Sequence, residues 1–254
     1  MALLTALITH HPAEQVARQL AYIESLVPGA RVFVCHGGRR ADFEALDGER
    51  AMFVDDPHWR AVNREQAYVG LLGALYERAV RPDPEVDLVL LLEYDQLVLS
   101  GDFEARLAAV AEASGAGLVG KWASARNDTN WPHYTRFRHE ERFNRYVERI
   151  STRDDPARRL GCLGAGMLLR RDALAAYCEA AEEPHVYGEL HVPTVIWHLG
   201  FEVADFDAYG DLYRAVRWRP EYSAEEAVAY KRAGVAFVHP FKELAALDVI
   251  ARAA

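Results

Sequence analysis

The stretch Asp87-Leu-Val-Leu-Leu-Leu-Glu-Tyr-Asp95 decides the fold class of this chain. Its apolar residues run without alternation, which is typical of a strand that is covered on both faces in a mostly parallel sheet. Three shorter apolar runs precede it, at residues 3–9, 31–35 and 51–54, and they alternate with two segments of helical period, at 13–26 and 59–79. This alternation predicts an α/β fold in which crossover helices flank a central sheet.

The rest of the chain continues this pattern within a single domain of residues 1–254. We predict later strands at 117–122, 161–170, 201–206 and 235–238, and helices at 103–113, 171–182, 188–199 and 223–232. Residues 123–160 differ, because they are polar, aromatic and Arg-rich, and residues 121–160 hold ten Lys or Arg against six Asp or Glu. We interpret residues 123–160 as an insertion, since no linker or repeat divides the chain.

The composition narrows the class of protein. A hydrophobic content of 51% over 254 residues supports a continuous core, and 38 acidic against 29 basic residues, a formal charge of −9, argues against a nucleic-acid partner. The three cysteines form no CxxC pair, which fits a reducing compartment. The chain begins without signal-peptide features, and no apolar run reaches the roughly 20 residues of a membrane span. We therefore expect a cytoplasmic protein with no integral membrane segment.

The carboxylates Glu93 and Asp95 are the most informative polar residues. Ligands of open α/β sheets bind beyond the carboxyl ends of the strands, and these two acids leave the central strand at alternate positions. Two carboxylates side by side repel each other unless a cation or hydroxyl groups receive them, and hard oxygen ligands suit Mg²⁺ or Mn²⁺. His239, at the end of a later strand, offers an imidazole compatible with Mn²⁺. Solvated strand ends remain the alternative for all three residues.

The motifs together resemble glycosyltransferases of the GT-A fold, a Rossmann-like arrangement. The resemblance rests on the Glu93-x-Asp95 motif, a strand containing Gly164-Ala-Gly166, an acidic residue that opens a later helix, and His239-Pro-x-Lys242. It implies a nucleotide-binding half in residues 1–100, a lid in residues 123–160 and an acceptor-side half in residues 161–254. It also implies a nucleotide-sugar donor, a small-molecule or saccharide acceptor, and Mn²⁺ or Mg²⁺ as cofactor.

The resemblance implies a role for each residue of this chain that matches a motif of the family. Asp95 and His239 would hold the metal, Glu93 would share the acidic motif, and Lys242 would meet a phosphate. The base and ribose of the donor would lie near four further residues: Thr9, His10, Asp56 and Arg64. Local structure explains each of these four as well, because Asp56 could cap a helix, Arg64 could be an exposed helix residue, and Thr9 and His10 could be hydrogen-bonded structure.

Glu189 matches the acceptor-side position where inverting relatives place a general base. A carboxylate there would accept the proton of the attacking hydroxyl. Many relatives carry two acids at this position, whereas this chain has Gly188-Glu189, so the stereochemistry stays open. A carboxylate that stabilises a helix N-terminus is the alternative.

Glycines and aromatic residues complete the expected site. Gly161, Gly164 and Gly166 in one strand predict a bulge or a close backbone approach. The insertion offers rings and cations for sugar and diphosphate, at Trp122, Trp131, Tyr134, Arg136 and Arg138. The same tryptophans could instead pack in the core or at a homodimer interface.

Three other functions compete with a metal-dependent glycosyltransferase. A transferase could use Lys242 and insertion arginines in place of a cation. A sugar-phosphate nucleotidyltransferase would share the sheet and the acidic ligands, but it usually has a Gly-rich basic loop after the first strand, where this chain has His10-His11-Pro12. A non-catalytic module could bind nucleotide sugars or glycans. The identities of the sugar, the base and the acceptor are not encoded in any motif.

Overall fold

A computed structural model describes residues 1–46, 48–55, 68–180, 182 and 186–253. Seven strands form one sheet in the order β3-β2-β1-β4-β7-β6-β8. Strand β7 is antiparallel to its neighbours β4 and β6, and the other pairings in this sheet are parallel. The prediction of an α/β domain with a mostly parallel central sheet is confirmed. The strands are β1 (Ala2–Thr9), β2 (Val32–His36), β3 (Ala51–Phe53), β4 (Val86–Glu93), β6 (Leu118–Ala125), β7 (Leu160–Arg170) and β8 (Val203–Asp205).

A second, smaller sheet has the order β5-β10-β9. Its strands are β5 (Leu97–Val98), β9 (Ala215–Val216) and β10 (Phe237–His239). The sequence predicts only β10, and it places that strand at 235–238 rather than 237–239. Strands β5 and β9 have two residues each, which is too short for a periodic pattern to indicate them.

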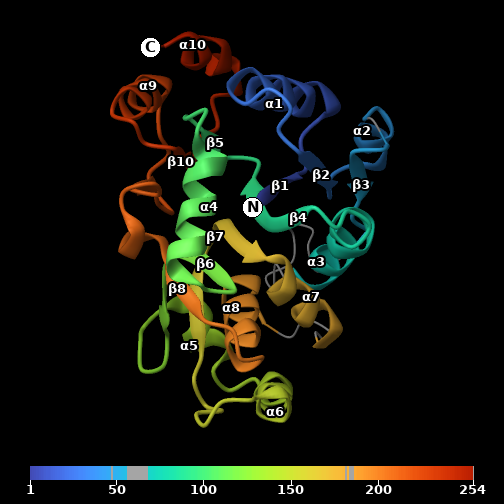
Figure 1. The fold of residues 1–254 in the computed structure, drawn as a ribbon, viewed down its shortest axis with the longest axis vertical. Helices are drawn as coiled ribbons and strands as arrows, with labels where there is room; N and C mark the ends of the chain where they lie inside the picture. Colours follow the sequence, from blue (N-terminus) through green and yellow to red (C-terminus); the bar gives the residue numbers. More distant parts are fainter. Residues whose placement is uncertain (47, 56–67, 181, 183–185, 254) are drawn as a thin grey trace.

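Helices cover both faces of the large sheet (Figure 1). They are α1 (Ala13–Leu26), α2 (Arg40–Glu44), α3 (Val69–Leu75), α4 (Phe103–Ser114), α5 (Pro132–Phe137), α6 (Glu141–Ile150), α7 (Arg171–Ala180), α8 (Gly188–His198), α9 (Ala224–Arg232) and α10 (Leu247–Arg252), with a π-helical turn η1 (Tyr76–Val80) and two 3₁₀ turns, η2 (Phe206–Tyr209) and η3 (Leu244–Ala246). Five predicted helices match these bounds within about two residues. Of the helix predicted at 59–79, residues 59–67 lie outside the described residues, and 69–80 are helical.

Central strand β4 shows why its sequence does not alternate. Leu88, Leu90 and Leu92 pack with α1, α4, α9 and α10 on one face of the sheet. Val89 and Leu91 pack with α3, α6, α7 and α8 on the other face. Each of these five side chains is at most 1% exposed. Successive strand residues point to opposite faces, and here both faces are buried.

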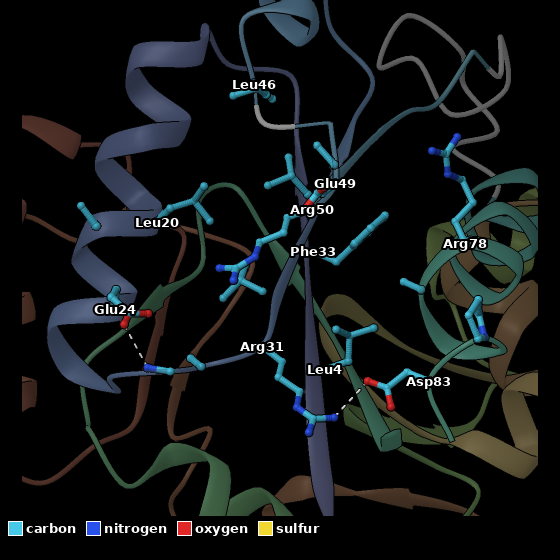
Figure 2. A pocket seen from close by; sticks show the side chains of 18 residues that line it. Leu4, Leu20, Glu24, Arg31, Phe33, Leu46, Glu49, Arg50, Arg78 and Asp83 are labelled. Carbon is cyan, nitrogen blue, oxygen red and sulfur yellow. Dashed lines mark hydrogen bonds and ion pairs between the residues drawn. The ribbon is translucent and has the colours of Figure 1, made fainter. Parts of the chain in front are cut away.

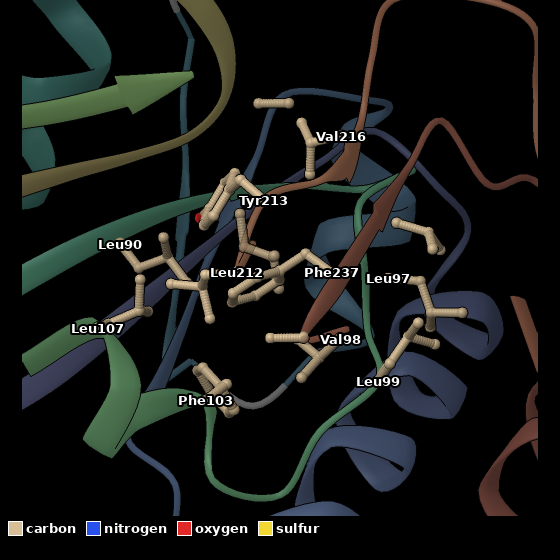
Figure 3. Packing of buried hydrophobic residues seen from close by; sticks show 14 of the residues in the cluster. Leu90, Leu97, Val98, Leu99, Phe103, Leu107, Leu212, Tyr213, Val216 and Phe237 are labelled. Atoms are coloured by element: carbon tan, nitrogen blue, oxygen red, sulfur yellow. The ribbon is translucent and has the colours of Figure 1, made fainter. Parts of the chain in front are cut away.

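The aromatic cluster of Figure 3 holds the small sheet against the large one. Phe237 of β10 lies 5.8 Å from the ring of Phe103 in α4 and 4.8 Å from the ring of Tyr213. Tyr213 also donates a hydrogen bond of 3.0 Å to the carbonyl of Gly166 in β7. These contacts place β10 beside Gly166 in the middle of β7, with its last residue, His239, near the carboxyl end of β4.

Residues 123–160 divide into two parts. Residues 123–125 extend β6, and helices α5 and α6 follow and pack against α8. In Figure 1, α6 lies at the lower end of the molecule, far from α9 and α10 at the upper end.

The predicted strand at 201–206 is shorter than expected, because Asp205 caps η2, which begins at Phe206. No helix in the described ranges has the length and apolar character needed to cross a membrane.

Candidate functional site

A cavity of about 820 Å³ opens where β4 and β10 end. Its lining includes Glu93, Asp95 and His239 from these strand ends, and Glu189 from the first turn of α8. Strand β7 runs antiparallel to β4, so the beginning of β7, at Gly164, also reaches this edge. The prediction of a ligand site at the carboxyl edge of the sheet therefore coincides with a cavity of the size that small ligands occupy.

Glu93, Asp95 and His239 form a compact cluster on one wall. Each offers one ligand atom, and these atoms lie within 4.8 Å of one another. The Nε2 atom of His239 lies 3.3 Å from Oδ1 of Asp95 and 3.6 Å from Oε2 of Glu93. The backbone amide of Phe241, two residues beyond His239, donates to the carbonyl of Asp95 at 2.7 Å and joins the two chain segments.

The donor set of this cluster fits a divalent cation. Oδ1 of Asp95 is buried, and the group that faces it is Nε2 of His239 at 3.3 Å, so this oxygen needs a positive charge beside it, either the protonated imidazole or a cation. The Nδ1 atom of His239 lies 2.7 Å from the carbonyl of Arg217, so this nitrogen carries a proton and donates it. This bond leaves Nε2 as the atom that can bind a metal ion. Two carboxylates and one imidazole suit Mn²⁺ or Mg²⁺.

His239 is protonated at neutral pH in the metal-free protein. Burial by itself would lower its pKa, but the contacts and charges of Asp95 and Glu93 outweigh burial and raise the pKa to about 10. A metal ion bound at Nε2 would therefore replace a proton.

Tyr68 orients the carboxylate of Glu93. Its hydroxyl donates to Oε1 of Glu93 at 2.8 Å. Burial, followed by the negative charge of Glu93, raises the pKa of Tyr68 well above its ordinary value, so the phenol remains a hydrogen-bond donor. With Oε1 occupied in this way, Oε2 is the oxygen that faces His239.

Glu189 approaches Gly164, next to the acidic cluster. Oε1 of Glu189 accepts a 2.6 Å hydrogen bond from the amide of Gly164. Oε2 lies 3.5 Å from Nε2 of His133, and the His133 ring stacks on Tyr187 at 3.9 Å. Burial raises the pKa of Glu189 to about 8, although the Gly164 bond opposes the shift. A carboxyl group of this kind exchanges its proton near neutral pH.

Gly164 allows the two carboxylates to approach each other. A Cβ atom at this position would lie 2.9 Å from the Tyr68 hydroxyl and 3.1 Å from oxygens of both Glu93 and Glu189. Gly161 packs against the ring of Trp131, and Gly166 has φ of +79° and packs against the Tyr213 hydroxyl. The predicted close backbone approach at these three glycines is confirmed.

The structure brings five of the nine predicted site residues to one cavity. Glu93, Asp95, Glu189, His239 and Lys242 all line the cavity. Lys242 is paired with Glu221, at 2.6 Å between Nζ and Oε1. Of the other predicted residues, Thr9 and His10 are described and are not among the residues that line it. The Thr9 side chain accepts from the amide of His11, the His10 ring packs on His11 and Tyr94, and Asp56 and Arg64 lie outside the described residues.

Four residues at the site have no sequence signal of their own: the cavity-wall residues Arg126, His133 and Tyr187, and Tyr68, which bonds to Glu93. They come from four separate segments, and only the tertiary fold brings them to Glu93 and Glu189. Trp122 in β6 and Trp131 in the insertion line the cavity as expected. Tyr134, Arg136 and Arg138 are not among its lining residues.

A second cavity, of about 830 Å³, lies between α1, β2 and η1 (Figure 2). Its charged groups serve local structure, because Arg31 pairs with Asp83 and Glu85, and Glu24 accepts from the amide of Gly29. The metal-ligand cluster found in the described part of the chain is the one at Glu93, Asp95 and His239. Chemistry rather than size therefore identifies the first cavity as the candidate site.

No protein-family model matches this chain, and no curated protein matches it. Solved structures are similar at low identity. The mannosyltransferase PcManGT from Pyrobaculum calidifontis, in complex with GDP-Man and Mn²⁺, is 15% identical, with 80% of this chain and 54% of that chain covered and a TM-score of 0.45. The galactosyltransferase LgtC, in complex with donor and acceptor sugar analogues, is 14% identical, with 81% and 73% covered and a TM-score of 0.35.

A nucleotidyltransferase shows the same degree of similarity. CMP:2-keto-3-deoxy-manno-octonic acid synthetase, complexed with CTP, is 14% identical, with 81% of this chain and 89% of that chain covered and a TM-score of 0.40. Similarities this low carry no argument about the function of this chain. The argument for function therefore rests on the site.

Proposed function

We propose that this protein is a glycosyltransferase that moves a sugar from a nucleotide-diphosphate donor to a hydroxyl acceptor with the assistance of Mn²⁺ or Mg²⁺. The observation that carries the proposal is the presence of two complementary groups in one cavity. Glu93, Asp95 and His239 form a cation-binding cluster, and Glu189 is a buried carboxyl group with a pKa near neutrality. Transfer of a sugar from a nucleotide diphosphate needs a group that neutralises the negative charge of the leaving diphosphate. It also needs a base that accepts the proton of the attacking hydroxyl.

Different residues of this chain would hold the cation and contact the phosphate. Asp95 and His239 would hold the cation, which supplies neutralisation of the charge that develops on the leaving diphosphate. Tyr68 orients Glu93 beside them. Lys242 lines the same cavity. Once its ammonium group no longer pairs with Glu221, it adds a positive charge that can contact a phosphate.

Glu189 is the proposed general base. The Gly164 amide fixes one of its oxygens, so the other oxygen, Oε2, is the one that would accept the proton of the acceptor hydroxyl. His133 lies 3.5 Å from that oxygen and helps to orient it. We also propose that residues 123–160 act as the lid over the donor, and that Thr9, His10, Asp56 and Arg64 lie on the path of the nucleotide.

Donor binding tests the proposal first. We expect the melting temperature of the purified protein to rise with one nucleoside diphosphate or nucleotide sugar, and to rise more when Mn²⁺ is present, because a ligand of the folded state stabilises it. Asp95→Asn should abolish the metal-dependent part of the shift. Asp87→Asn is the matched control, because Asp87 is an exposed carboxylate at the other end of β4.

Product analysis separates the alternatives. Release of nucleoside diphosphate from a nucleotide sugar supports the proposed reaction. Unchanged release in EDTA would favour a metal-independent transferase that uses Lys242 and arginines. Release of pyrophosphate from a nucleoside triphosphate and a sugar phosphate would replace the proposal with nucleotidyl transfer, and binding without turnover would reduce it to a binding module.

A further inference from the structure

We propose that Trp122 forms the platform of an acceptor subsite for a pyranose saccharide, on the Glu189 wall of the cavity. The proposal rests on the proposed function and names its acceptor class. It excludes a simple alcohol or a lipid chain as the group that this wall recognises.

The backbone of Trp122 adopts a conformation that its residue type disfavours. Its φ is +58°, and among the described residues only Asp128 shares a positive φ without being glycine. Asp visits this region readily because its short polar side chain bonds locally, whereas a bulky aromatic residue does not. A strained backbone conformation persists only where contacts with the surrounding structure enforce it. Residues with such a conformation are often found at functional sites.

Tertiary contacts impose this conformation on Trp122. Its amide donates to Oδ1 of Asp205 at 3.0 Å, and its carbonyl accepts from Nη2 of Arg126 at 2.6 Å. Asp205 is 83 residues away in the sequence, and Trp122 lies where the pairing of β6 with β7 shifts register between Lys121 and Ser124, so the strain depends on the neighbouring strands as well as on the nearby Arg126. The fold therefore holds one particular side chain in a position that an unstrained strand would not give it.

The indole that results is exposed to the cavity rather than buried. Trp122 is 42% exposed and Trp218 is 67% exposed, and both line this cavity. Among the described residues, the other exposed large apolar side chains are Met1 and Val249, which do not line it. Exposed large rings gathered at one concave site indicate a ligand surface.

The two tryptophans belong to different walls. Arg126 links Trp122 to the Glu189 wall, because the same Nη2 also donates to the carbonyl of Gly161 at 3.1 Å and the guanidinium lies 4.5 Å from the Trp131 ring. Trp131 in turn contacts His133, which faces Glu189. Trp218 instead follows Arg217, whose carbonyl holds His239 on the metal wall. A ligand on Trp122 therefore lies on the side of the proposed base.

The chemistry of this wall fits a saccharide. A pyranose has an apolar C–H face that packs on an indole, and a rim of hydroxyl groups that need hydrogen-bond partners. Arg126, His133 and Glu189 supply charged and polar partners in the same cavity. A lipid chain would leave these polar groups without partners, at a cost to binding.

Binding of the protein to a printed glycan array, with nucleoside diphosphate and Mn²⁺ present, tests the subsite without requiring turnover. We expect pyranose glycans to bind the wild type, and Trp122→Gly to lose at least tenfold in signal. Glycine accepts the positive φ without strain, so this variant should melt no lower than the wild type. Trp122→Phe should keep part of the signal, and Trp218→Ala should keep nearly all of it.

The outcomes are distinct. An unchanged signal in Trp122→Gly, an equal loss in Trp122→Gly and Trp218→Ala, or no glycan bound by the wild type would each overturn the saccharide platform. Failure of the proposed function has a different signature, namely glycan binding that depends on Trp122 in a protein that neither binds Mn²⁺ and a nucleotide nor releases nucleoside diphosphate.

Discussion

Replacing Glu189 with glutamine should make the metal-free protein more stable at alkaline pH. The wild-type carboxyl group has a pKa of about 8 in the folded protein, against an ordinary value of 4.5. The folded protein therefore keeps a proton that the unfolded chain releases between these two pH values, and its free energy of unfolding falls as the pH rises through this window. Glutamine has nearly the same shape and does not ionise.

The size of the effect follows from the shift. A difference of about 3.5 pKa units corresponds to about 5 kcal/mol, and this is the upper limit above pH 8. The side chain is 12% exposed, so solvent reaches it and relaxation reduces the penalty, to an expected gain of about 2 kcal/mol for Glu189→Gln. Below pH 4.5 the two proteins should be equally stable, because neither carries a charge at this position.

Urea unfolding in EDTA, repeated from about pH 4.5 to about pH 8.5, measures the difference directly. Glu112→Gln is the control, because Glu112 is exposed on α4 and should give a flat difference curve. The same Glu189→Gln protein should bind Mn²⁺ and nucleotide normally but transfer sugar about 10²- to 10⁴-fold more slowly. Glu189→Gln that is no more stable than the wild type at alkaline pH would refute the argument that burial raises this pKa.

Three further predictions concern the residues around these carboxylates. Gly164→Ala should lower the free energy of unfolding by about 1–3 kcal/mol, because its Cβ would lie 2.9 Å from the Tyr68 hydroxyl. Gly73→Ala, with no atom within 4 Å of the new Cβ, should raise it by about 0.5–1 kcal/mol in the same urea titration. Tyr68→Phe removes the donor to Glu93 and should cost about 1–3 kcal/mol by the same measurement, and an unchanged midpoint would contradict the assigned bond. His239 has its pKa raised to about 10 from 6.5, so its contribution to metal-free stability should be complete below pH 6.5 and disappear as the pH rises to 10, in the wild type but not in His239→Gln. Calorimetry of Mn²⁺ binding in buffers of different ionisation enthalpy should show a proton released in that window, and its absence would exclude Nε2 as a ligand.

The central strand shows what the sequence determined by itself. The apolar run of β4 predicts a doubly covered strand, and the two acids that follow it predict a polar site at its end, because strand periodicity and strand-end chemistry are local properties. The cap of α9 is equally local, because Ser223 and Glu226 lie three residues apart and form a capping box. Five of the nine expected site residues reach one cavity for the same reason, since strand ends and helix starts meet at the carboxyl edge.

Only the tertiary structure decided which groups meet there. His239 reaches Asp95 because two-residue strands and an aromatic cluster hold β10 in place, and those contacts leave no periodic signal in the sequence. The pKa of Glu189 depends on burial by several segments, and Tyr68 and His133 orient the two acids from distant positions along the chain. Local patterns predict elements and their ends, whereas burial, charge proximity and strain arise only when segments far apart in sequence pack together.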